Sequence, residues 1–199
     1  NVEGDWTAAS YYYLSIALAG GKIKLYNLVE ESIQGDKIIS DIFNKYGVLS
    51  HFGKNTVEIF KLSHIKSNYF EQSFINYPDI FLTIAVACAA LDIKAKLTGL
   101  SNLVYKESNR LDAFCENIRK CGFDVINNSN YEIIITGNKE KPKTVPIIKT
   151  YEDHRIAMAF APLSATLGEI IIDKPEVVLK SYPSFWNDLQ GIGYEISYV

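Results

Sequence analysis

The sequence predicts a mixed α/β (α+β) fold in which one supersecondary unit is used three times. Asp5, Asp79 and Asp153 each open an apolar run, and the two intervals between them are equal, since 79 − 5 and 153 − 79 both give 74. Gly20 and Gly168 close two of these runs and lie twice that interval apart. Regular spacing of this kind is the mark of a repeated unit. We expect one domain, 1–199, with units of about 1–64, 65–140 and 141–199.

The middle unit shows its elements most clearly. Residues 80–91 are apolar on every face and too few to cross a membrane, so they predict a helix that is buried on all sides. Leu111, Phe114 and Ile118 recur at helical spacing within 107–121. Alternation predicts the strands, which we place at about 65–74, 93–100, 123–126 and 131–136, the last two forming a hairpin that turns at 127–130.

The flanking units repeat this order. The first predicts helices at 6–19 and 36–46 and strands at 22–28, 48–52 and 57–62. The third predicts strands at 145–150, 169–172 and 194–199 and helices at 153–167 and 184–192. Pro162 lies inside one of these helices and predicts a kink there, because proline removes a backbone hydrogen bond.

Composition narrows the classes of protein. The net charge of −3 gives no basic surface for nucleic acid, and no secretory leader or membrane span is visible. Three cysteines without metal-ligand spacing predict reduced thiols in the cytoplasm. The chain begins at Asn1 without Met and enters a helix almost at once, so we expect a piece of a longer protein.

Polar residues gather at the predicted helix starts, where unpaired N–H groups and the helix dipole favour anions. Each has an ordinary alternative: an Asp there is more often an N-cap, and Glu107 with Arg110 could be a solvated pair. His154 could cap a helix, and Lys180 could be a surface lysine. Their joint placement at matching points of one repeat favours an anion site instead. Its candidates are Asp79, Lys106, Glu107, Arg110, Asp153, His154, Arg155 and Lys180.

Three segments carry a family resemblance. Residues 106–111 (KESNRL), 151–158 (YEDHRIAM) and 180–183 (KSYP) resemble signatures of the EPSP synthase (3-phosphoshikimate 1-carboxyvinyltransferase) family. Residues 3–5 (EGD) and 78–79 (PD) resemble two further family segments in the same order. The resemblance covers essentially the whole chain and corresponds to the C-terminal half of such an enzyme. Two residues depart from the pattern: Asn109 stands where Asp is common, and Trp6 where a small residue is common.

The resemblance implies a domain of three βαβαββ units, with helices inside and sheets outside, which is one domain of an inside-out barrel. It implies transfer of the enolpyruvyl group of phosphoenolpyruvate to the 5-hydroxyl of shikimate 3-phosphate, in aromatic amino-acid biosynthesis. No metal or organic cofactor is implied. The implied partners are these two substrates and an N-terminal domain of the same enzyme, without which the chain should be inactive. We expect a monomer.

The resemblance also implies residue roles. Asp79 is similar to the proton acceptor that contacts the shikimate hydroxyls, and Glu107 to the second acid/base group. Asn102 and Lys106 resemble contacts to shikimate 3-phosphate. The cationic clamp around phosphoenolpyruvate, where glyphosate binds sensitive members, corresponds to Arg110, Arg155 and Lys180, with His154 beside it.

Two other functions stay open. One is the sister enolpyruvyl transferase that acts on UDP-N-acetylglucosamine, which shares the architecture. The other is a non-catalytic repeat domain that binds anions or a partner. A substrate screen separates the first from the predicted activity, and a test for turnover separates the second.

Overall fold

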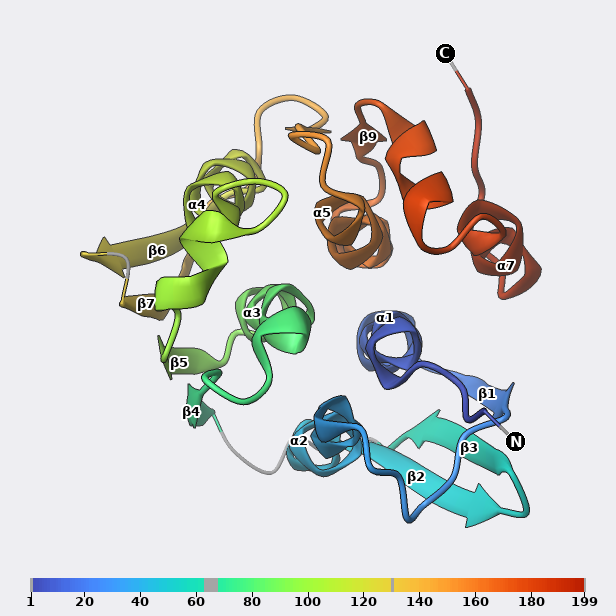
Figure 1. Ribbon diagram of the computed structural model, residues 1–199. Coiled ribbons are helices and arrows are strands. Elements are labelled where there is room, and N and C mark those ends of the chain that lie inside the picture. Colours follow the sequence, from blue (N-terminus) through green and yellow to red (C-terminus); the bar gives the residue numbers. More distant parts are fainter. Residues whose placement is uncertain (1, 63–67, 130, 199) are drawn as a thin grey trace.

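Three helices form the centre of the molecule and three sheets lie outside them. The computed structural model describes residues 2–62, 68–129 and 131–198. Figure 1 shows α1 (Trp6–Ala19), α3 (Phe81–Ala90) and α5 (His154–Phe160) nearly end-on, surrounded by the sheets. The three helices pack against one another. This is the predicted arrangement of inner helices and outer sheets.

The first and middle units have the predicted strands. β1 (Lys22–Tyr26), β3 (Thr56–Lys61) and β2 (Val48–Gly53) form an antiparallel sheet in the order β1-β3-β2. The second sheet has the order β4-β5-β7-β6, and β4 runs parallel to β5. Its strands are β4 (Tyr69–Ser73), β5 (Lys94–Thr98), β6 (Phe123–Asn128) and β7 (Glu132–Lys139). The first three residues of the strand predicted at 65–74, and one residue of the turn predicted at 127–130, lie outside the described residues.

Short helices complete these two units. η1 (Gly35–Ile38) leads into α2 (Ile39–Lys45), and η2 (Pro78–Ile80) leads into α3. η3 (Ser101–Tyr105) precedes α4 (Arg110–Lys120), and α4 begins three residues later than the sequence predicts. The late start arises because Asn109 is the N-cap of α4, its side chain accepting a hydrogen bond from the Asp112 amide.

The third unit departs most from the prediction. Its sheet is a parallel pair of two-residue strands, β8 (Ile147–Ile148) and β9 (Ile171–Ile172). The helix predicted at 153–167 is broken at Pro162 into α5, η4 (Ala161–Leu163) and α6 (Ser164–Leu167), as the proline predicts. η5 (Pro175–Lys180) was not predicted, and α7 (Phe185–Gly191) follows it.

The strand predicted at 194–199 is wrong for residues 194–198, the part that the structure describes. These residues have no strand pairing there. Tyr194 and Ile196 are half-buried against the core, whereas Glu195 and Ser197 are exposed. Their alternation therefore comes from packing against the core. Residues 194–198 also line a cavity of about 260 Å³, together with parts of α7 and β9.

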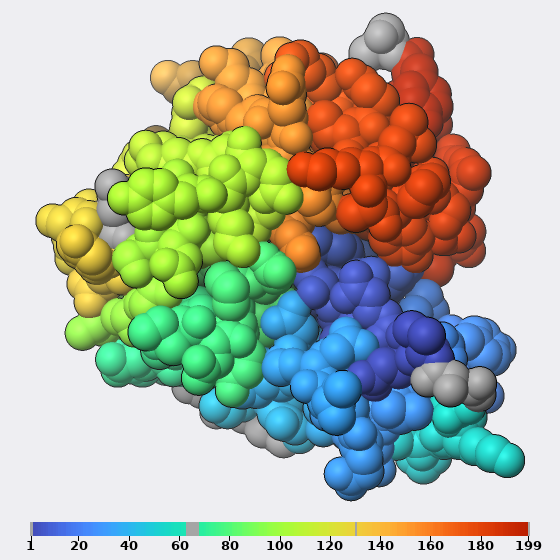
Figure 2. All heavy atoms as spheres, in the orientation of Figure 1, coloured from blue at the N-terminus to red at the C-terminus, as the bar shows by residue number. Residues whose placement is uncertain are grey.

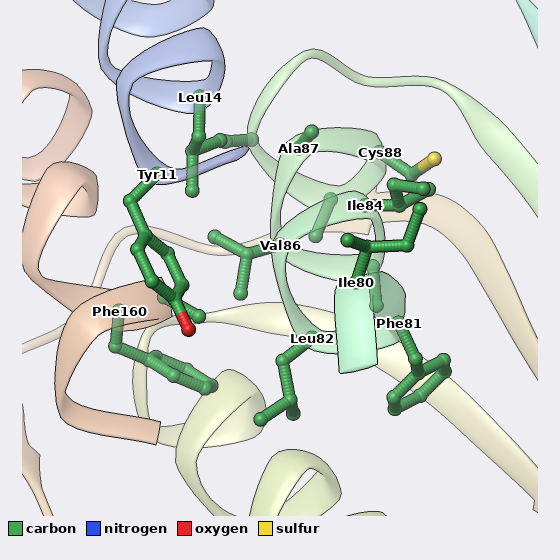
Figure 3. Packing of buried hydrophobic residues seen from close by; sticks show 14 of the residues in the cluster. Tyr11, Leu14, Ile80, Phe81, Leu82, Ile84, Val86, Ala87, Cys88 and Phe160 are labelled. Carbon is green, nitrogen blue, oxygen red and sulfur yellow. The ribbon is translucent and has the colours of Figure 1, made fainter. Parts of the chain in front are cut away.

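The core confirms that the central helix of the middle unit is buried on all sides. Every residue of α3 is buried, and the most accessible, Ala90, is 8% exposed. Figure 3 shows Leu82 and Val86 of α3 facing Tyr11 of α1 and Phe160 of α5. Each such side chain contributes roughly 1.5–3 kcal/mol by leaving water. Among the described residues, no helix has the length and apolar character needed to span a bilayer.

Glycines after the second helix of each unit keep the register of the repeat. Gly47, Gly122 and Gly193 follow α2, α4 and α7 with φ of 81°, 87° and 105°, the left-handed region in which a side chain is strained. A Cβ on Gly122 would lie 1.8 Å from the carbonyl oxygen of Glu140. The same chain reversal therefore occurs three times.

Candidate active site

Arg110, the first residue of α4, joins the carboxylates of three other segments. Its side chain is only 1% exposed. Its Nε donates to Asp153 Oδ2 at 2.8 Å, its Nη1 to Asp79 Oδ1 at 3.2 Å and its Nη2 to Glu107 Oε2 at 2.6 Å. The starts of α3, α4 and α5 therefore converge around one buried guanidinium. In Figure 2 the starts of α3, α4 and α5 lie in the green, lime and orange parts of the chain. These parts meet the blue start of α1 near the centre of the face shown.

Asp153 is the structural carboxylate of this group. It is fully buried, and its Oδ1 accepts a hydrogen bond from the Arg155 amide at 3.0 Å as the N-cap of α5. Its Oδ2 accepts from the Ser108 hydroxyl at 3.2 Å as well as from Arg110. With its oxygens occupied by helix, hydroxyl and guanidinium, Asp153 fixes the geometry of its neighbours.

Asp79 is held by cations and not by a helix end. It lies within η2, whose start has no side-chain cap. Its Oδ1 lies 3.5 Å from Lys106 Nζ and 3.2 Å from Arg110 Nη1, and its Oδ2 lies 3.2 Å from Arg155 Nη2. The side chain is 32% exposed, so one face of this carboxylate remains open to a substrate.

Glu107 pairs with two cations, one at each carboxylate oxygen. Oε2 accepts from Arg110, and Oε1 lies 3.5 Å from Lys180 Nζ. Partial burial acts to raise the pKa of Glu107, but a hydrogen bond from its own amide and the charges of Arg110 and Lys180 leave that pKa below its ordinary value. Glu107 is therefore a carboxylate at neutral pH, 29% exposed beside the most exposed cation of the cluster.

Two candidates lie at the margin of this network. His154 is buried, with Nδ1 4.0 Å from Asp153 Oδ1, and that nitrogen has no hydrogen-bond partner among the described residues. Burial lowers the pKa of the imidazole, against the opposing charge of Asp153, so the ring is neutral at pH 7. Asn102 is exposed on η3 and makes no hydrogen bond to the network within the described part of the chain.

Two residues near α1, Asp36 and Tyr11, were not among the candidates from the sequence. Asp5 caps α1 by accepting from the Thr7 amide at 2.7 Å, and the Thr7 hydroxyl donates to Asp36 in η1. Burial raises the pKa of Asp36, the Thr7 hydrogen bond acts against it, and the charges of Asp79 and Arg155 are close enough to contribute. Asp36 looked like an ordinary helix start, and no motif marked it.

Tyr11 is the second missed residue. It is 2% exposed on α1, and its hydroxyl has no hydrogen-bond partner of ordinary geometry among the described residues. Burial raises the pKa of Tyr11, and the nearby Arg155 guanidinium is the strongest influence in the opposite direction. The residue sits in an apolar helix with two further tyrosines, so its position beside a cation left no signal in the sequence.

The arrangement can bind an anion and move protons. Lys106, Arg155 and Lys180 have exposed side-chain fractions of 32%, 19% and 59%, and each now pairs with a carboxylate of the chain. A phosphate or carboxylate of a ligand can replace those carboxylates as the partner of the cations. Asp79 and Glu107 would then be released next to it, as two carboxylates that share Arg110.

Solved structures show which class of protein has this fold. EPSP synthase from Acinetobacter baumannii superposes with a TM-score of 0.75 at 22% identity, over 99% of this chain and 48% of that one. The enolpyruvyl transferase NikO from Streptomyces tendae superposes with a TM-score of 0.69 at 13% identity, over 100% and 45%. The fold is thus that of enolpyruvyl transferases.

The sequence itself specifies the family. Residues 1–189 match the model of the EPSP synthase (3-phosphoshikimate 1-carboxyvinyltransferase) family, and the chain belongs to that family. The 3-phosphoshikimate 1-carboxyvinyltransferase of Bacteroides fragilis (strain YCH46) is 38% identical over 98% of this chain and 48% of its own length. That of Methanosphaerula palustris is 33% identical over 96% and 44%. The chain spans about half the length of the curated relatives it matches.

Proposed function

We propose that this chain is the C-terminal half of a transferase that moves the enolpyruvyl group of phosphoenolpyruvate to the 5-hydroxyl of shikimate 3-phosphate. The observation that carries the proposal is the pair of part-exposed carboxylates, Asp79 and Glu107, held by one buried arginine among three accessible cations. Membership of the family supports it. The products are 5-enolpyruvylshikimate 3-phosphate and phosphate.

The chemistry requires two proton carriers. Addition of the hydroxyl across the enol double bond removes a proton from oxygen and delivers one to the methylene carbon, and the later elimination takes a proton back from that carbon. Asp79 accepts the hydroxyl proton in this proposal, and Glu107 serves the methylene. When an anionic substrate draws Lys180 away from Glu107, the carboxylate loses a stabilising charge and its pKa rises, which favours the protonated donor form.

The cations divide between the two substrates. Lys106, which pairs with Asp79, and the exposed Asn102 contact shikimate 3-phosphate in this assignment. Arg155 and Lys180 bind phosphoenolpyruvate, with His154 beside them. Arg110 also belongs to the clamp in this assignment, and its burial between three carboxylates favours an organising share of that role.

We propose further that a second half, such as the relatives possess, completes the site, and we call the joined protein the complete enzyme. It is proposed to be a cytoplasmic monomer. The test measures phosphate release from both substrates by the complete enzyme and by residues 1–199 alone. Turnover by the complete enzyme and none by the chain alone is expected. Turnover with UDP-N-acetylglucosamine in place of shikimate 3-phosphate would overturn the assignment, and inactivity of the complete enzyme would favour a non-catalytic domain.

A further inference from the structure

The segment that carries Lys180 crosses between two parts of the molecule. η5 ends at Lys180, and α7 begins five residues later at Phe185. On one side, Lys180 Nζ reaches Glu107 Oε1 at 3.5 Å. On the other side, the hydroxyl of Tyr182 lies 2.7 Å from the hydroxyl of Tyr12 on α1. The segment therefore spans from the first central helix to the start of α4.

Most hydrogen bonds of this segment join it to other residues of the third unit. The amide of Tyr182 donates to the Val178 carbonyl at 2.8 Å, and the Trp186 indole donates to the Pro175 carbonyl at 2.9 Å. These bonds give the segment its shape, but they do not fix its distance from α1. Packing of η5 against α5 places the beginning of the segment. The distance between α1 and the residues after Lys180 depends further on contacts that cross to the first unit.

Tyr12 and its neighbour on α1 supply those contacts. The Tyr11 ring meets the Phe185 ring edge-on at 5.9 Å, and Phe185 in turn meets the Tyr182 ring at 5.6 Å. These edge-to-face contacts favour one arrangement of the rings, but they tolerate centroid separations over a wide range. The hydroxyl pair adds direction, since a hydrogen bond restricts both distance and angle. In Figure 1, α7 lies on the side of α1 that faces away from α3.

We propose that the Tyr12–Tyr182 hydroxyl pair is a latch that positions Lys180 for the anionic substrate bound beside Glu107. The two tyrosines are positioning residues that act through Lys180, and this role rests on the proposed function. Lys180 is 59% exposed on a long, flexible side chain, so its placement depends on the backbone that carries it. The packing of η5 against α5 holds this backbone from one side, and the latch holds it from the other.

The chain offers a matched control on the same helix. The Tyr13 hydroxyl lies 2.7 Å from the Ser50 hydroxyl, the same separation as in the latch, but it joins α1 to β2. Tyr12→Phe and Tyr13→Phe therefore each remove one hydroxyl from α1 and keep the ring. Only the first should affect the substrate that Lys180 binds.

The test compares these variants and Tyr182→Phe in the complete enzyme. Loss of one neutral hydrogen bond should raise the KM for phosphoenolpyruvate about fivefold in Tyr12→Phe and Tyr182→Phe, and should leave the KM for shikimate 3-phosphate unchanged. The Tyr182 hydroxyl also lies close enough to Asp188 to interact with it, so the double variant should be no worse than Tyr182→Phe alone, because the Tyr12–Tyr182 bond is then already lost. Amide hydrogen exchange of residues 181–186 should accelerate by a similar factor, with Tyr13→Phe unchanged in both measurements.

An equal rise in the KM for phosphoenolpyruvate in Tyr13→Phe would overturn the latch, since general loosening of α1 would then explain it. Unchanged KM and unchanged exchange in Tyr12→Phe would overturn it as well. If the wild-type complete enzyme shows no turnover, the proposed function fails, and the exchange measurement alone then decides whether the hydroxyl pair orders the segment.

Discussion

The starts of α1 and α3 hold equivalent aspartates of one repeat, and the two residues do different work. The Asp5 carboxylate accepts a hydrogen bond from the Thr7 amide, so Asp5 is a helix cap. Asp79 sits within η2, caps no helix and pairs with Lys106, Arg110 and Arg155. An extra 3₁₀ turn moves the second aspartate away from the helix end. Small differences in local backbone thus separate a structural carboxylate from a chemical one.

The start of α5 lies between these extremes. Asp153 caps its helix as Asp5 does, and it binds Arg110 as Asp79 does. It is also fully buried, so it cannot meet a substrate. The three positions therefore form a series from cap, through cap and anchor, to open carboxylate, and Arg110 connects the last two.

Arg110→Leu should lower the free energy of unfolding more than the other changes, because Arg110 connects Asp79 with Asp153. The change leaves Asp153 buried without its charge partner, and breaking a buried pair in this way costs about 3–5 kcal/mol. The free energy of unfolding in urea is the measurement. Arg119→Leu on the same helix removes one hydrogen bond to the Val125 carbonyl and should cost about 1 kcal/mol. Equal losses would contradict the central place of Arg110.

Asp79→Asn and Asp5→Asn test the comparison itself. Asparagine is as good a cap as aspartate, so Asp5→Asn should keep turnover and stability close to wild type. Asp79→Asn removes the proposed proton acceptor and should lower kcat by roughly 10²–10⁴-fold with a smaller change in KM. Steady-state kinetics of the complete enzyme provide the readout. Comparable kcat losses in the two variants would show that Asp79 has no special role.

Glu107 should make stability depend on pH in the acid range. Its folded pKa is lowered, so its contribution is fully present above the unfolded value of about 4.3 and is lost as the pH falls through the folded pKa. Glu107→Gln should therefore flatten part of the decline in unfolding free energy below about pH 4.3. Urea unfolding from pH 3 to 6, with the exposed Glu195→Gln as control, measures the difference. An unchanged slope in Glu107→Gln would contradict the ion pairs with Arg110 and Lys180.

The sequence predicts the repeat well because its signals are local. The all-apolar run of α3 and the breaking of the third helix at Pro162 are visible in the sequence without knowledge of what each segment packs against. The two-residue sheet of the third unit and the irregular chain at 194–198 were not predictable, since alternation at Tyr194 and Ile196 has the same form whether a strand pairs or only packs.

The candidate site divides in the same way. Charged residues in short motifs could be picked out. Seven of them form one connected network of ion pairs: Asp79, Lys106, Glu107, Arg110, Asp153, Arg155 and Lys180. Tyr11 and Asp36 could not be picked out, because their closeness to Arg155 and Asp79 comes from residues far away in the sequence. Likewise, the burial of Arg110 depends on the positions of Asp79 before α3 and Asp153 at the start of α5.

Asn109→Asp should have the smallest effect and separates capping from chemistry at the start of α4. The Asn109 amide donates to the Asp112 carboxylate at 2.6 Å and accepts from the Asp112 amide at 3.3 Å. An aspartate keeps the second bond and its favourable position at a helix start, but it turns the first bond into a like-charge contact. A loss of about 0.5 kcal/mol in unfolding free energy follows, which Asp112→Asn should relieve and 1 M salt should screen.

Because Asn109 caps the helix and carries no proton in the proposed reaction, kcat should stay unchanged. A large fall in kcat would place this residue among the groups that touch substrate, and the division between caps and chemical carboxylates would fail at α4.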